Sequence, residues 1–154
     1  MPIDILLPAH TAVSIIAILI GIPVVAGLLR GRDRPALTAV FLAAAFITSA
    51  SGFLFPFFQL LPSHVIGAIA LLVLAVTVPA RRRWPRIHAA GLVASLYLLS
   101  FVGIAQAFAK IPALNAIAPG HADWPFQAAQ VFVLMLFVGL GIVALRRVAR
   151  PSLA

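Results

Sequence analysis

The sequence predicts an all-α integral membrane protein: a bundle of five transmembrane helices with its N-terminus outside and its C-terminus in the cytoplasm. Three observations lead to this prediction. Of the 154 residues, 64% are hydrophobic and only 9% are charged, with a mean hydropathy of +1.17, whereas soluble domains have about 45–50% apolar and about 25% charged residues. Long runs of the chain carry no charge, and arginines gather in three clusters between or after these runs.

The runs without Asp, Glu, Lys or Arg cover residues 5–29, 35–80, 87–109 and 124–145. A membrane-spanning helix needs about 20 apolar residues. The run 35–80 is too long for one helix, and Pro56 and Pro62 interrupt it around polar residues. Because proline removes a backbone donor and clashes with the preceding turn, we expect a turn there. The single transmembrane domain, residues 1–154, then has spans near 5–29, 36–57, 63–80, 87–108 and 126–145.

The first run has the length of a signal peptide, but its flanking charges argue against one. A signal peptide carries cationic residues before its apolar stretch. Here only Asp4 precedes the stretch, and the arginines follow it. We therefore expect residues 5–29 to stay in the protein as its first span.

The arginines indicate the direction of the spans. All cationic residues except Lys110 are arginines, and each cluster adjoins the end of an apolar run. Short basic loops stay on the cytoplasmic side of a membrane, and five spans place all three clusters on one side. The expected cytoplasmic anchor consists of Arg30, Arg32, Arg34, Arg81, Arg82, Arg83, Arg86, Arg146, Arg147 and Arg150.

The net charge of +8 does not indicate a nucleic-acid binder in this chain. The basic residues are not interleaved with aromatic residues in the way that grips a nucleic-acid strand. The expected partner is the lipid bilayer, with anionic headgroups at the arginines. The chain has no cysteine, so disulfides, thiolate metal sites and iron–sulfur clusters are excluded.

Polar residues, most of them neutral, gather toward the predicted outer face, and every span contributes at least one. They form the candidate ligand-binding set His10, Gln59, His64, Gln106, Lys110, Gln127 and Gln130. One interpretation is a polar pocket that opens outward, with aromatic residues such as Phe53, Phe55 and Trp124 at its rim. The other is that polar and aromatic residues collect at any membrane interface, where water is near.

His10 and Gln106 fit the interfacial interpretation least, because each is expected a turn or more inside the apolar zone. A glutamine amide has two donors and an acceptor, and lipid leaves these groups unsatisfied. We therefore expect Gln106 to face the bundle, within reach of Gln127, Gln130 or His10.

Few enzymatic chemistries fit the remaining residues. The three acids, Asp4, Asp33 and Asp123, lie at or beyond span ends, whereas proton-coupled carriers generally place a carboxylate inside the membrane. No phosphate-binding loop, zinc-binding helix or nucleophile-elbow pattern occurs. We expect a small non-enzymatic membrane protein, either an accessory subunit or a binder of an apolar ligand. Its expected protein partners are a larger membrane complex or further copies of the same chain in a homo-oligomer.

Two alternatives stay open at this point. Neutral imidazole is a common ligand of haem iron, and His10 and His64 come from different spans at similar depth. The chain could therefore be a membrane redox component that binds haem b or quinone through these two residues; no other metal site is predicted. The second alternative is a small transporter, which five spans could form as an oligomer.

Several short stretches form a recognisable pattern: residues 48–57, 62–64 and 106–114, then Ala118-Pro119, residues 125–127 and Gln130. This pattern resembles a family of small multi-pass bacterial inner-membrane proteins without an assigned activity. The resemblance covers roughly residues 10–130. It implies the bacterial inner (cytoplasmic) membrane as the location, and it assigns no functional residue.

Overall fold

The computed structural model describes residues 3–55, 62–120 and 123–148, and every secondary-structure element in these ranges is a helix. Five helices are long and apolar enough to cross a membrane, which confirms the all-α class and agrees with five spans. They are α1 (Ile3–Leu29), α2 (Pro35–Ser51), α3 (Pro62–Arg83), α4 (Pro85–Lys110) and α6 (Trp124–Val148). The two short elements are the 3-10 turn η1 (Gly52–Leu54) and α5 (Pro112–Ile117).

The observed boundaries differ by a few residues from the expected ones. α2, α4 and α5 each begin at a proline, which fits the first helical turn because an N–H there has no helical partner. α3 continues to Arg83, beyond the expected end at 80. α2 ends at Ser51, before the expected end at 57, because the backbone tightens into η1. The expected loop 109–125 contains α5, which the sequence pattern did not predict.

Two tight turns join neighbouring helices at one end of the bundle. Gly31 has a φ of 67°, a left-handed conformation that glycine adopts without steric cost. Arg32 N–H donates across it to the Gly27 carbonyl at 2.9 Å, a bonding pattern that closes the C-terminus of α1. Only Trp84 separates α3 from α4, and its N–H donates to the Ala80 carbonyl at 2.8 Å.

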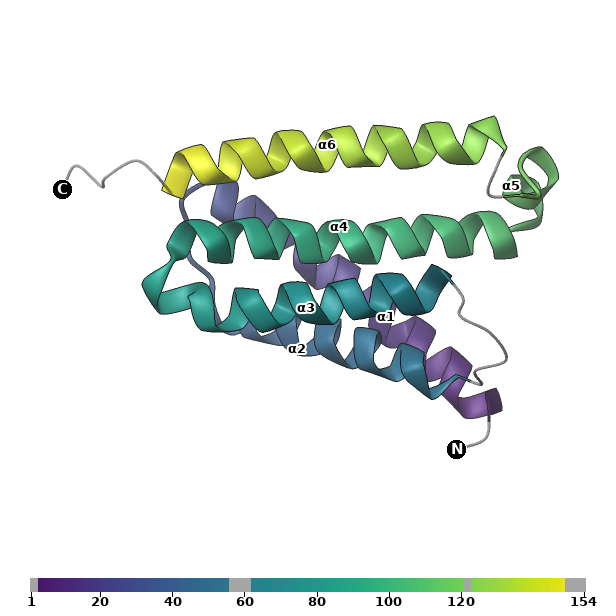
Figure 1. The fold of residues 1–154 in the computed structure, drawn as a ribbon, viewed down its shortest axis with the longest axis horizontal. Coiled ribbons are helices and arrows are strands. Elements are labelled where there is room, and N and C mark those ends of the chain that lie inside the picture. Colours follow the sequence, from purple (N-terminus) through teal and green to yellow (C-terminus); the bar gives the residue numbers. More distant parts are fainter. Residues whose placement is uncertain (1–2, 56–61, 121–122, 149–154) are drawn as a thin grey trace.

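α4 is the central helix of the bundle. It packs most extensively against α3 and α6 and also against α1, whereas α6 packs mainly on α4 and less on α1. Figure 1 shows α4 between α6 and α3, with α1 running obliquely and slanting away from α6 toward its N-terminus. As a result, only 11% of the most apolar segment of α6 is buried, against 22–33% for the other spans.

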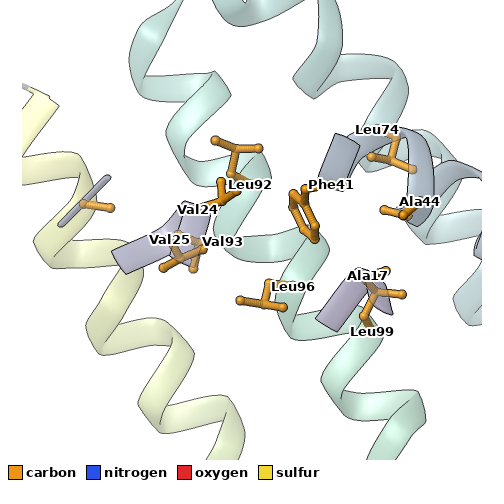
Figure 2. Packing of buried hydrophobic residues seen from close by; sticks show 12 residues of the cluster. Ala17, Val24, Val25, Phe41, Ala44, Leu74, Leu92, Val93, Leu96 and Leu99 are labelled. Atoms are coloured by element: carbon orange, nitrogen blue, oxygen red, sulfur yellow. The ribbon is translucent and has the colours of Figure 1, made fainter. Parts of the chain in front are cut away.

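The core of the bundle is apolar and centres on Phe41 of α2, which is fully buried. Figure 2 shows its ring among side chains of α1 and α4, with Leu92, Leu96 and Ala17 around it. Gly21 of α1 permits this packing, because a Cβ at that position would lie 2.6 Å from Leu96 Cδ1 and 2.7 Å from Phe41 Cε2. In lipid, close packing of this kind rather than the hydrophobic effect holds helices together.

A second close approach joins α3 to α4. Thr77 is only 1% exposed, and a Cβ added at Gly91 would collide with its side chain, with Thr77 Cβ 2.8 Å away. His88 bonds the same pair of helices, because its Nδ1 lies 2.8 Å from the Thr77 carbonyl oxygen and donates to it. These contacts fix α3 against α4 near the turn at Trp84.

The two ends of the bundle differ in charge. The end of α1, the start of α2, the turn between α3 and α4 and the end of α6 meet at one end (Figure 1), which we call the arginine end. All arginines of the predicted anchor that the structure describes are exposed there; Arg150 lies outside the described residues. The opposite end, which we call the distal end, contains the start of α1, η1, the start of α3, the end of α4, α5 and the start of α6.

Candidate functional site

His10 connects α1 to the end of α2. Its Nδ1 lies 2.8 Å from the Ser51 hydroxyl oxygen, and its half-buried ring packs edge-on against Phe55, with ring centroids 5.4 Å apart. Ser51 donates its own proton to the Thr48 carbonyl at 3.2 Å. With that proton used, the tautomer of His10 that fits this arrangement has its proton on Nδ1, donates it to Ser51 and has its lone pair on Nε2.

His64 lies at the start of α3 and is 6% exposed. Its ring is tilted against the ring of Phe53, with centroids 6.0 Å apart. Phe53 in turn lies against Gly67, where an added Cβ would be 3.2 Å from Phe53 Cε2. His10 and His64 therefore contact the same short segment, residues 51–55, from two different helices.

Gln130 takes part in a different contact, between α6 and α4. It is 8% exposed, and its Nε2 donates to the Phe101 carbonyl at 3.0 Å. Its Oε1 is buried without a partner among the described residues. The amide thus links α6 to α4 by one hydrogen bond.

The expectation that Gln106 faces the bundle is wrong. Its side chain is exposed, and it makes no hydrogen bond to a described residue. Gly103 of α4 still approaches α1, since a Cβ there would lie 3.3 Å from Ile18 Cδ1. Toward the distal end α1 slants away (Figure 1). The last turns of α4, which contain Gln106, therefore no longer pack against α1. Lys110 and Gln127 are exposed as well.

The distal end does contain a pocket, of about 100 Å³, between α4, α5 and α6. Phe108 and Phe126 form its aromatic wall, with ring centroids 5.5 Å apart and ring planes at 83°. Asn115 of α5 adds an amide, whose Nδ2 donates to the Phe108 carbonyl at 3.3 Å. Its Oδ1 has no bond to a described residue and can accept one from a ligand. The remaining lining residues are Ala105, Ala109, Ala118, Pro119 and Gly120.

None of these pocket residues belongs to the set predicted from the sequence. Helical spacing selects faces of the long spans, whereas this pocket depends on α5, which lies outside them. One signal was present: Asn115 is the only asparagine of the chain, and it follows Pro112, a residue suited to the start of a short helix.

Gln59, a member of the predicted set, lies outside the described residues. Among the residues that the structure does describe, no group of three or more His, Asp or Glu side chains is placed to hold a metal ion.

Comparison of the chain with protein-family models, with curated proteins and with solved structures found no match. The functional assignment therefore depends on the chain's own residues.

Proposed function

We propose that this chain is a small non-enzymatic protein of the bacterial inner membrane that binds an apolar ligand in the pocket between α4, α5 and α6. In this proposal the distal end, and with it the pocket, faces outward. The positive-inside rule supports that direction, because all described anchor arginines share the other end. The resemblance in residues 10–130 supports the choice of membrane.

The observation that carries the proposal is the combination of an aromatic wall with one hydrogen-bond acceptor. Phe108 and Phe126 supply the wall, and Asn115 Oδ1 supplies the acceptor. Ligand pockets are typically apolar with a few placed polar groups. An engineered cavity of about 150 Å³ binds benzene, so the pocket of about 100 Å³ fits a few methylene groups or part of one ring. Exposed Pro119 and Gly120 at its edge let the rest of a longer ligand project outward.

A photoreactive octanol that carries a diazirine tests this proposal, because it combines an alkyl chain with one hydroxyl donor. The protein in nanodiscs is labelled, digested and analysed by mass spectrometry. We expect saturable labelling in α5 and at the adjoining ends of α4 and α6. Ala105→Leu fills the pocket and should reduce this labelling by at least about threefold, whereas Ala128→Leu, on an exposed position of α6 that does not line the pocket, should not.

Labelling that does not saturate and spreads along the exposed face of α6 would contradict the proposal, because it would report partition into lipid. Unchanged labelling of Ala105→Leu, in protein that folds normally, would contradict it as well.

A redox role is the second candidate, and the state of His10 favours it. A ligating histidine ordinarily donates its other ring N–H to a neighbouring group, which fixes its orientation. In the tautomer that donates from Nδ1 to Ser51, Nε2 has the lone pair that haem iron or a quinone hydroxyl requires. His64 contacts the same segment through Phe53.

A reduced-minus-oxidised visible spectrum of protein purified from haem-replete cells tests this second candidate. Sharp haem bands that disappear in both His10→Ala and His64→Ala would support it. Colourless protein whose organic extract contains no stoichiometric quinone would refute it.

A further inference from the structure

Several hydroxyl side chains on the spans are satisfied within their own helix. Four of them donate, at 2.6–2.9 Å, to the carbonyl one turn earlier: Thr11 to Leu7, Ser14 to His10, Thr77 to Val73 and Ser100 to Leu96. This is the usual arrangement for a hydroxyl on a helix in an apolar medium. Thr48 of α2 and Ser95 of α4 depart from it, and of these two only Ser95 lines a cavity. Ser95 is 3% exposed, and its Oγ is buried without a partner among the described residues.

Ser95 lines a cavity of about 40 Å³ between the last part of α2, the first half of α3 and the middle of α4. Ser49 of α2, which is 8% exposed, lines the same cavity from the opposite helix. The other walls are aliphatic side chains and Gly67. A water molecule needs about 10–15 Å³ of such space, so the cavity has room for at least one.

The partners that a water molecule needs are also present. A buried water ordinarily makes about 2–4 hydrogen bonds. Ser95 and Ser49 each offer a hydroxyl, and the Ser49 carbonyl oxygen lies 3.7 Å from a Cβ built at Gly67, on the same side of α2. A buried hydroxyl with no partner is costly, whereas a bridging water is nearly as good as a direct bond.

We propose that this cavity is a hydration site inside the transmembrane core, in which water bridges the hydroxyls of Ser95 and Ser49. Phe53 closes it on the side of His64, because its ring lies against Gly67 and against the His64 ring. The site is separate from the pocket between α4, α5 and α6, which shares no lining residue with it.

Infrared spectroscopy of Ser95→Cys tests the proposal directly. The native chain has no cysteine, so the S–H stretch of this variant is the only one in the spectrum. We expect its frequency to be lowered by hydrogen bonding and the band to convert to S–D after transfer to D2O. Ser100→Cys is the matched control: Ser100 lies on the same helix but does not line the cavity, and its hydroxyl is already bonded to Leu96. The control band should convert much more slowly.

The stability of Ser95→Ala gives a second readout, because a water-filled cavity and a dry cavity predict different changes in the unfolding equilibrium. If water bridges the hydroxyls, Ser95→Ala should raise the unfolding equilibrium constant about threefold, the equivalent of about 0.6 kcal/mol for one bond in a membrane. If the cavity is dry, the same change removes an unpartnered hydroxyl and leaves that constant unchanged or lower.

Persistence of the S–H band of Ser95→Cys in D2O would overturn the proposal, whatever the stability of Ser95→Ala. Should Ser95→Cys fail to fold, Ser49→Cys is judged by the same criterion, because Ser49 lines the same cavity.

Discussion

The imidazole of His10 and the hydroxyl of Ser51 meet at 2.8 Å and join α1 to α2 at the distal end of the bundle. Deeper in the bundle, the same two helices meet where Gly21 lies against Phe41. One helix pair is thus held by a polar contact near one end and by close packing further along. Because lipid provides no hydrophobic force between helices, both kinds of contact contribute to stability.

Replacing both partners of the polar contact should reveal its strength. In a double-mutant cycle of His10→Phe and Ser51→Ala, measured by unfolding in bicelles, we expect a coupling free energy of about 0.6 kcal/mol and at most about 1.7 kcal/mol. Phenylalanine keeps the ring that packs against Phe55. The control cycle combines Ser14→Ala with Ser51→Ala; Ser14 bonds within its own helix, so its coupling should be close to zero. A coupling near zero for His10 would mean that the bond contributes nothing.

Gly91→Ala should destabilise the protein strongly. The added methyl group collides with the side chain of Thr77, and neither helix backbone can move easily in the tight hairpin at Trp84. Overpacking of this kind costs about 1–3 kcal/mol, which unfolding in bicelles would measure. Gly139→Ala is the control, because a Cβ at position 139 meets no atom within 4 Å. Equal stability of the two variants would contradict the close approach of α3 and α4.

Two glutamines that look alike in the sequence should respond differently to the same change. Gln130→Leu removes the bond to the Phe101 carbonyl and should lower the free energy of unfolding by about 0.6 kcal/mol. Gln106 is exposed and makes no bond to a described residue, so Gln106→Leu should leave that free energy unchanged or raise it. A larger loss for Gln106→Leu than for Gln130→Leu would show that α4 is turned differently about its axis.

Cysteine labelling in intact cells should establish the direction of the bundle. An impermeant maleimide should react from outside with Ala116→Cys, an exposed position on α5. It should not react with Ser152→Cys, which comes four residues after the end of α6 in the sequence. Ala118 is a poor choice for this experiment, because it is only 3% exposed. Labelling of Ser152→Cys alone would reverse the proposed orientation.

Local features were sufficient to predict the helices. The charge-free runs, divided at Pro56 and Pro62, predicted the five long helices to within a few residues at most ends, because length and apolar composition decide whether a helix can cross a bilayer. The short helix α5 was missed, since six residues are too few to show a period.

The sequence by itself therefore determined the class of the protein, the number of its spans and the gathering of its arginines at one end. Only the tertiary structure decided which polar residues have partners. His10, Gln106 and Gln130 all belonged to the candidate set for the outward-opening pocket, yet His10 bonds to Ser51, Gln106 is exposed and Gln130 bonds to a backbone carbonyl. The physical reason is that helical spacing fixes positions around one helix axis, whereas the tilt of α1 relative to α4 depends on contacts between different helices, such as those at Gly21 and Gly103.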